Sequence, residues 1–333
     1  MSYLIAEIGQ SHDGSLGIAH SYIDALKDVG VDAIKFQIHI AEAESSRHEP
    51  FRTKFSYEDE SRYDYWKRME FNYEQWEGLK KHCDDSNIEF IASPFSIKAS
   101  SWLKKLKVKK VKIGSGEINN KLLIDHISNY VDEIIFSSGL CSEIELQDII
   151  NYSLKKFKKI SLLQCTSEYP CSPENWGLDY ISYFKQKFKN IKIGYSDHSG
   201  TITSSIAAAA LKAEIIEFHV TFDKKMFGPD SSSSLTINEV KKLCNAVRKI
   251  KASRNSGFNK FSQSNTTEIK NIFSKSLTIN DNLKKNHTII LENLETAKPG
   301  MMGISPKDYK NILGKKLKQN MKKGDFLNYD DLI

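Results

Sequence analysis

Two histidines follow two neighbouring strand-like runs of this 333-residue chain, and their spacing suggests a metal site. Residues 191–195 and 214–218 are rich in β-branched and aromatic side chains, and His198 and His219 come within three residues of their ends. The alanine-rich segment between them is a good helix former, so a right-handed parallel crossover would bring both histidines to one sheet edge. Either histidine alone is better explained as an ordinary half-buried residue. Together, with Asp230 close by in sequence, they predict a divalent metal with positions left open for a substrate.

A lysine near another strand end points to a bound anion. Lys112 lies between two β-branched residues, and a buried lysine needs an anionic partner. Ser93, Ser115 and Ser137 stand at the ends of further strands. Each is most simply a helix N-cap, but a helix N-terminus that carries a hydroxyl is itself a phosphate site, so the two interpretations are compatible. These residues predict an anion site at the same edge.

The strands that would position these groups alternate with helical or loop segments. Eight strand-like runs occur, at residues 3–8, 32–39, 88–95, 108–117, 133–139, 160–170, 191–195 and 214–218. This count and spacing over about 250 residues predict an α/β fold, a (β/α)8 TIM barrel, with its active site at the C-terminal strand ends. The alternative, an open doubly wound sheet, would usually show a Gly-rich dinucleotide fingerprint after its first strand, and the sequence lacks one. Residues 41–72 form a long polar stretch, which we expect to be an irregular loop serving as a functional lid.

Composition limits the partners and the compartment. The net charge of +6, from 48 basic and 42 acidic residues, is mild, and without a nucleic-acid motif it fits anionic small substrates better than DNA. The five cysteines are scattered and include no CxxC pair, which is typical of reduced thiols and predicts a cytoplasmic protein. No apolar run approaches the ~18 residues of a membrane span. We therefore expect neither a nucleic-acid nor a membrane partner.

The C-terminal part of the chain reads as a separate small domain. Between about residues 253 and 267 the composition shifts to Asn, Ser, Gly and Lys without visible periodicity, which indicates a linker. We predict a barrel domain at 1–255, a linker at 256–272 and a tail domain at 273–333. A domain this small buries little core and usually leans on something larger.

The motifs at the strand ends resemble those of the sialic acid synthase family, in the right order and over nearly the whole chain. They are Ala6-Glu7-Ile8-Gly9, Lys35-Phe36-Gln37, Ser93-Pro94-Phe95, Lys112-Ile113-Gly114-Ser115-Gly116-Glu117, Cys165-Thr166-Ser167-Glu168-Tyr169-Pro170, Gly194-Tyr195-Ser196-Asp197-His198, Glu217-Phe218-His219-Val220-Thr221 and Gly228-Pro229-Asp230. The tail, with its Pro-Gly-x-x-Gly-Ile loop at 299–304, resembles that family's antifreeze-like (SAF, β-clip) domain.

The resemblance implies that phosphoenolpyruvate condenses with an open-chain N-acyl hexosamine, giving a nine-carbon 2-keto-3-deoxy sugar acid and phosphate. It implies Mn²⁺ or Mg²⁺ on His198 and His219. The residues implied to hold phosphoenolpyruvate are Ser93, Lys112, Ser115, Ser137, Ser167 and Ser196. Those implied to face the sugar are Glu7, Gln37, Tyr169, Asp230 and Lys298. The implied catalytic residues are Glu7, Lys112, Glu117 and Asp230, with Glu117 positioning or deprotonating the attacking water.

The same resemblance implies a domain-swapped homodimer in which each tail caps the partner's barrel mouth. Four features depart from the family pattern: Ser11-His12 replaces an Asn-His pair, Ser167 replaces the asparagine of some members, Lys298 replaces an arginine, and four serines, 231–234, follow Asp230. The first and third changes touch the sugar side, so the hexosamine stays open between N-acetylmannosamine and a 2,4-diacetamido-trideoxyhexose. Two alternatives remain: a related barrel synthase that uses a pentose or tetrose phosphate, and a non-catalytic carbohydrate-binding protein.

Overall fold

The computed structural model describes residues 2–53, 55–261 and 266–333. The chain divides into two compact units, Met1–Ser256 and Gly257–Ile333.

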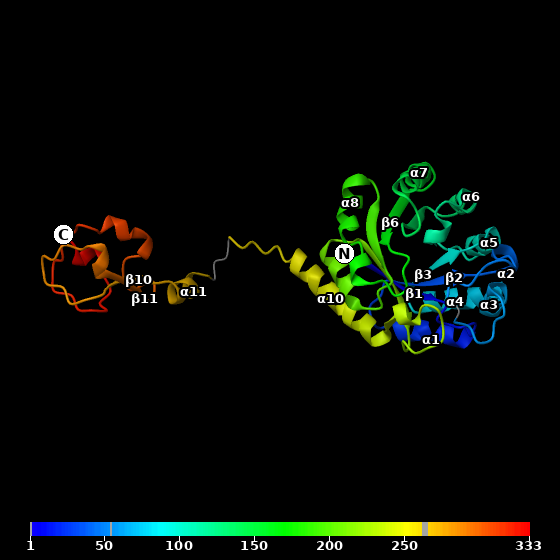
Figure 1. Cartoon of the computed structure of the whole chain (residues 1–333), viewed down its shortest axis with the longest axis horizontal. Coiled ribbons are helices and arrows are strands. Elements are labelled where there is room, and N and C mark those ends of the chain that lie inside the picture. Colours follow the sequence, from blue (N-terminus) through cyan, green and yellow to red (C-terminus); the bar gives the residue numbers. More distant parts are fainter. Residues whose placement is uncertain (1, 54, 262–265) are drawn as a thin grey trace. The chain divides into compact units, whose positions relative to one another are not determined.

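The first unit is a closed parallel barrel, as the alternation of elements predicted (Figure 1). Its strands are β1 (Tyr3–Gly9), β2 (Ala33–Ile38), β3 (Glu89–Pro94), β4 (Lys110–Ile113), β5 (Glu133–Ser137), β6 (Lys159–Cys165), β7 (Lys192–Asp197) and β8 (Ile215–Thr221). Neighbours pair in chain order, and β1 also pairs with β8, in register from Tyr3 opposite Ile215 to Glu7 opposite His219. The short β9 (Leu235–Thr236) adds to β8 beyond the barrel.

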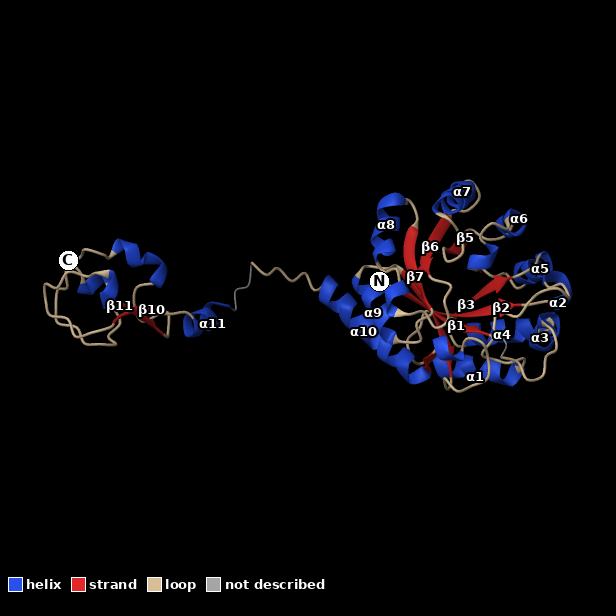
Figure 2. Cartoon of the chain, in the orientation of Figure 1, coloured by secondary structure: helices blue, strands red, loops and turns tan. Residues whose placement is uncertain are grey.

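Helices surround the strands (Figure 2). They are α1 (Leu16–Leu26), α2 (Ala41–Glu44), α3 (Arg62–Met69), α4 (Tyr73–Asp85), α5 (Ile97–Lys105), α6 (Lys121–Ser128), α7 (Glu143–Ser153), α8 (Asp179–Lys187), α9 (Ile202–Ala210) and α10 (Ile237–Asn255). Their apolar faces pack on the outer faces of the strands and form the main core. Because parallel strands are covered on both sides, their residues are buried almost throughout, including all seven of β8.

Residues 41–72 are not the irregular loop that the polar composition predicted. They contain α2 and α3, and the N-cap of α3 is Ser61, whose hydroxyl accepts the backbone N–H of Asp64. Tyr65, Trp66 and Met69 of α3 are buried in a small cluster of their own. The aromatic residues of the stretch, more than its charges, decide its structure.

The second unit is a small domain built on an antiparallel pair, β10 (Ser276–Ile279) with β11 (Leu294–Ala297). Its separate core contains Leu277, Ile279, Ile289, Ile312, Leu317 and Leu327. The predicted linker is partly helical, because α11 occupies Thr266–Phe273, and its residues 262–265 lie outside the described residues. No helix in the described part of the chain is long and apolar enough to cross a membrane.

Candidate active site

On six of the eight strands, the side chain that faces the barrel interior changes from apolar to polar within two positions. An apolar layer closes it, made of Ile5, Ala33, Ile91, Ile135, Leu163 and Ile215. Because side chains alternate along a strand, the residues two positions later face the same interior. Those residues are Glu7, Lys35, Ser93, Ser137, Cys165 and Glu217. The polar layer lies on the C-terminal side, where TIM barrels carry their active sites.

Two lysines and two glutamates form a buried charge cluster in the polar layer. Lys112 Nζ lies 2.7 Å from Glu217 Oε1, and Lys35 Nζ lies 2.6 Å from Glu7 Oε2 and 3.8 Å from Glu217 Oε1. All four side chains are at most 4% exposed. Glu217 Oε2 has no hydrogen-bond partner among the residues that the structure describes, so the cluster retains an unused acceptor.

The pKa values of the cluster follow from burial and from the pairing. Burial raises the pKa of the Glu7 carboxyl. Burial also opposes the charge of Glu217, but the ammonium groups of Lys112 and Lys35 outweigh it and lower the pKa of Glu217 to about 2. Burial lowers the pKa of Lys112. For Lys35, the nearby carboxylates outweigh burial and raise the pKa. The cluster therefore contains a lysine whose charge burial disfavours and which an anion would stabilise.

A cavity of about 350 Å³ opens above this cluster. We call it the inner cavity. Its lining includes Glu7, Lys35, Ser93, Lys112, Ser115, Ser137, Cys165, Ser167, Ser196 and Glu217. The structure thus brings together Lys112 and all five predicted serines. Gly139 leaves room in this wall, because a Cβ there would lie 2.4 Å from Ser167 Oγ and 2.8 Å from Ser115 Oγ.

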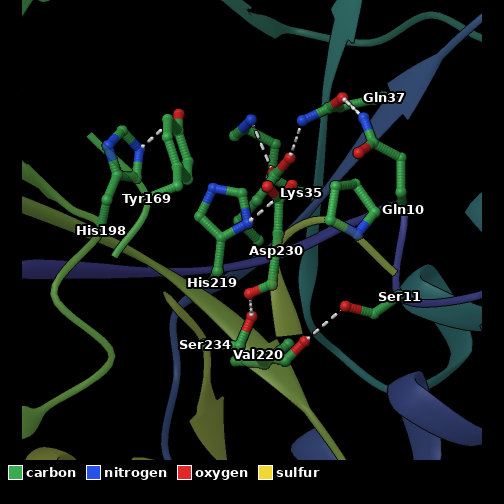
Figure 3. A network of polar contacts seen from close by, with 12 residues as sticks. Gln10, Ser11, Lys35, Gln37, Tyr169, His198, His219, Val220, Asp230 and Ser234 are labelled. Atoms are coloured by element: carbon green, nitrogen blue, oxygen red, sulfur yellow. Dashed lines mark hydrogen bonds and ion pairs between the residues drawn. The ribbon is translucent and has the colours of Figure 1, made fainter. Parts of the chain in front are cut away.

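The two histidines lie side by side, with ring centroids 5.3 Å apart. His198 Nδ1 is 2.7 Å from the carbonyl oxygen of Thr166, which only accepts, so Nδ1 carries the proton and Nε2 keeps its lone pair. That lone pair faces the Tyr169 hydroxyl at 3.0 Å (Figure 3). His219 Nδ1 is buried without a hydrogen-bond partner in the described part of the chain, and lies 3.8 Å from Asp230 Oδ2.

Both imidazoles are suited to hold a divalent cation. Burial lowers the pKa of His198 to about 4 and lowers that of His219 as well, so both rings are neutral at pH 7. Neutral imidazole nitrogens with free lone pairs are common metal ligands. No group of three or more His, Cys, Asp or Glu side chains arranged for a metal occurs among the described residues. The two histidines would therefore need substrate or water to complete a coordination shell.

A second cavity, of about 360 Å³, adjoins the first and is called the outer cavity. It is lined by Gln10, Gln37, His39, Glu44, Glu49, Arg52, Arg62, Trp66, Phe95, Gly116, Glu117, Tyr169, His219, Pro229 and Asp230. Both cavities share the residues at their boundary, which are Gln37, Arg52, Phe95, Gly116, Tyr169 and His219. Glu117 lines only the outer cavity, where it accepts a bond from Asn120 Nδ2 at 2.7 Å, and burial raises its pKa.

An arginine from the predicted lid reaches the site. Arg52 Nη2 lies 2.7 Å from Asp230 Oδ1, and its guanidinium lies 4.2 Å from the centre of the Tyr169 ring. Lys298, predicted on the sugar side, belongs to the second unit, where its ammonium lies over the ring of Phe273.

Sequence reasoning missed several residues of the site, among them Lys35, Glu217 and Arg52. Lys35 and Glu217 belong to the motifs shared with the family, but the prediction of site residues used only the positions at the strand ends. Counting back two positions from Gln37 and His219 along the strand period would have found them. Arg52 carries no such signal, because its position depends on how residues 41–72 fold.

Known protein families match most of the chain. The model of the NeuB family matches residues 22–259, and that of the SAF domain matches residues 274–333. An N,N'-diacetyllegionaminic acid synthase of Campylobacter jejuni is 35% identical over 97% of this chain and 98% of the relative. The human N-acetylneuraminate-9-phosphate synthase is 30% identical over 97% of this chain and 90% of the relative. A crystal structure of the N-acetylneuraminic acid (sialic acid) synthetase of Leptospira borgpetersenii, in complex with citrate, is similar with a TM-score of 0.69 and 31% identity over 80% of this chain and 90% of that one.

Proposed function

Because the chain belongs to the NeuB family of sialic-acid-type synthases, we propose that it condenses phosphoenolpyruvate with an N-acyl hexosamine. The products are a nine-carbon 2-keto-3-deoxy sugar acid and inorganic phosphate. The acceptor is N-acetylmannosamine or a 2,4-diacetamido-trideoxyhexose, since relatives named as synthases of sialic, legionaminic and pseudaminic acids have similar identity to this chain.

The main support for this proposal comes from the groups that line the inner cavity. Phosphoenolpyruvate presents a phosphate and a carboxylate, and the cavity offers two ammonium groups and five serine hydroxyls. Charge-assisted bonds to such anions are about twice as strong as neutral ones. An anion bound near Lys112 would compete with Glu217 for its ammonium and restore the charged form that burial disfavours.

The acceptor sugar is assigned to the outer cavity, with its aldehyde end at the boundary. There Gln37, Tyr169 and His219 face both cavities, so C3 of phosphoenolpyruvate can approach the aldehyde carbon. A Mn²⁺ or Mg²⁺ ion on His198 and His219 would polarise the aldehyde carbonyl.

The remaining step is the addition of a water molecule, which must lose a proton. After the new C–C bond forms, water adds at C2 and phosphate leaves. We assign the proton transfer from this water to the carboxylate of Glu117, because burial raises its pKa and brings it nearer to the working pH. Glu7 is hydrogen bonded to Gln37 Nε2 at 2.7 Å and positions the sugar side.

We propose that the tail domain of each chain serves the active site of a partner subunit. We propose that domains 1–255 and 273–333, joined by the linker 256–272, form a cytoplasmic, domain-swapped homodimer. In it Lys298 of one chain would reach the sugar in the other chain's site. Support comes from the small core of the second unit and from the SAF match at residues 274–333.

A phosphate-release assay tests the function directly. The purified chain is incubated with phosphoenolpyruvate, Mn²⁺ and a panel of hexosamines, and each product is measured by mass spectrometry. We expect phosphate and a product mass equal to phosphoenolpyruvate plus sugar plus water minus phosphoric acid. If phosphate appears equally without any sugar, or not with any member of the panel, the proposal fails.

A further inference from the structure

A chain of polar contacts continues outward from the buried charge cluster to the short helix α2. Gln37 Nε2 donates to Glu7 Oε1 at 2.7 Å, and Gln37 Oε1 accepts from Gln10 Nε2 at 3.0 Å (Figure 3). The same Oε1 lies 3.0 Å from His39 Nε2. Glu7, whose other oxygen faces the Lys35 ammonium, acts as an acceptor, so the amide nitrogen of Gln37 must point toward it. The amide oxygen then faces His39, and His39 Nε2 must carry a proton.

His39 is held in place on every side. Its ring is stacked between Trp66, with centroids 3.8 Å apart, and Phe95, with centroids 4.4 Å apart. Its Nδ1 lies 2.5 Å from Glu44 Oε1, and Glu44 Oε2 accepts the backbone N–H of Ile40 at 3.3 Å. The side chains of His39 and Glu44 are 6% and 7% exposed. Because a carboxylate only accepts, Nδ1 donates to Glu44 as Nε2 donates to Gln37, and the stacked ring has no space to rotate.

The contacts differ from those of a purely structural pair. A buried imidazole and carboxylate that only fastened α2 to the barrel would need no bond toward the site. Here the ring joins Glu44 on one edge to the Gln37 amide on the other, and both His39 and Glu44 line the outer cavity. A flipped Gln37 amide would present oxygen to the Glu7 carboxylate, which is repulsive unless Glu7 is protonated. The His39 proton disfavours that flip.

We propose that His39 and Glu44 are positioning residues that fix the orientation of the Gln37 amide and thereby the acceptor side of the site. This inference rests on the proposed assignment of the sugar to the outer cavity. His39 and Glu44 line the outer cavity and not the inner one, so we expect the larger effect on the acceptor half of the reaction.

Steady-state kinetics with each substrate varied separately form the first test. His39→Phe keeps the aromatic stack and removes both nitrogens. We expect it to raise the KM for the hexosamine about tenfold, the effect of one well-placed hydrogen bond, while the KM for phosphoenolpyruvate stays within about twofold. Glu44→Ala should act in the same direction. Glu44→Gln should be close to wild type, because its amide can donate to Nδ1 and leave the Nε2 proton in place.

The matched control is Glu42→Ala, on the same helix. Glu42 is exposed and pairs with Lys98 at the surface, so its loss should leave both KM values unchanged. Thermal unfolding of all variants separates positioning from stability. If His39→Phe lowers the melting temperature without changing the ratio of the two KM values, or raises both equally, the positioning role is wrong.

A second measurement does not depend on turnover. In the full-length chain labelled with ¹⁵N-histidine, the ring nitrogens of His39, assigned by comparison with His39→Phe, should show Nε2 protonated. An unprotonated Nε2 would overturn the inference even if the enzyme is active. The expected signal in a chain that releases no phosphate with any hexosamine would leave the positioning pair standing and reject the proposed function instead.

Discussion

The inner and outer cavities meet at His219, yet they are built from different parts of the chain. The inner cavity is walled mainly by strand residues and the turns that follow them, with Arg52 as its contribution from residues 41–72, and the pleat fixes the direction of each strand residue. The outer cavity takes much of its wall from residues 41–72, through α2, α3 and the segment between them. The inner cavity combines two ammonium groups with serine hydroxyls, and it shares the Arg52 guanidinium with the outer cavity. The outer cavity sets four carboxylates, Glu44, Glu49, Glu117 and Asp230, against two guanidinium groups, Arg52 and Arg62.

Under the proposed function, the inner cavity binds the substrate that stays the same, phosphoenolpyruvate, and the outer cavity binds the one that can vary, the hexosamine. A site for a small anion such as phosphoenolpyruvate needs cations in fixed positions, and a closed barrel supplies them at alternate strand positions. Selecting among hexosamines needs adjustable walls, and connecting segments can change without disturbing the barrel. We infer that the choice of acceptor is determined by residues 41–72 and by the partner's tail, while the binding of phosphoenolpyruvate is determined by the strands.

The largest effect is expected at the boundary of the cavities. His219→Ala or His198→Ala should abolish turnover, because each removes one of two neutral imidazoles proposed to hold the metal. The fold should survive, since both residues lie at the barrel mouth above the apolar layer. Bound metal is measured together with activity. Near-native activity of either variant after chelation and metal add-back would show that the two-histidine site is wrong.

Removing the tail should produce a loss almost as large, because the outer cavity would lack the partner's Lys298. Deletion after about Thr267 should weaken both dimerisation, measured by sedimentation, and turnover. Mixing a His198→Ala chain with a Lys298→Ala chain should restore part of the activity, since some heterodimers would carry one intact site. If heterodimers form without any rescue, the tail serves its own barrel.

The inner cavity is tested at Lys112. Lys112→Met removes charge-assisted bonds worth roughly 1.5–3 kcal/mol each, so the KM for phosphoenolpyruvate should rise about 10- to 150-fold and that for the sugar should change little. The variant also leaves the Glu217 carboxylate with Lys35 alone, which should destabilise the fold. The double variant Lys112→Met/Glu217→Gln should recover stability but not affinity. A rise in the sugar KM instead would move Lys112 to the other cavity.

How far the sequence predicted these features depends on which cavity they belong to. The barrel follows from eight alternating runs. The grouping of Lys112 with Ser93, Ser115 and Ser137 follows from their common place near strand ends, and Ser167 and Ser196 were added by the family resemblance. Lys35 and Glu217 were predictable as well, because the period of two that places Gln37 and His219 in the interior also places the residues two positions earlier.

The outer cavity was much less predictable. Arg52, His39 and Glu44 face the site because Tyr65, Trp66 and Met69 form a small core that anchors residues 41–72. Such packing within a connecting segment leaves no periodic signal, and the polar composition suggested an irregular loop. The assignment of roles to individual residues is also beyond sequence pattern, and stays a set of predictions for the variants proposed above.

A smaller effect, on the pH profile, is expected for Glu117. This carboxyl must be ionised to accept a proton, and burial raises its pKa above the ordinary value of 4.5. The turnover number should therefore fall on the acid side with an apparent pKa above that value. Glu117→Gln should lower turnover by roughly 10²–10⁴-fold at the optimum and flatten this limb. If the acid limb persists unchanged in the variant, another group is the base.

The smallest effect is expected at Arg52, where the outer cavity meets the solvent. Its ion pair with Asp230 is part exposed, with 43% of the arginine side chain accessible, so screening by water limits its contribution to roughly 0.2–1 kcal/mol. Arg52→Ala should raise the sugar KM only about two- to fivefold, and less at high salt, because the lost interaction is largely electrostatic. Arg47→Ala, which removes an exposed arginine of the same segment, serves as the control. Arg52 lines both cavities, so the comparison of the two KM values decides its role. If Arg52→Ala raises the KM for phosphoenolpyruvate more than that for the sugar, the arginine serves the inner cavity, and the separation of the two halves would not hold at this residue.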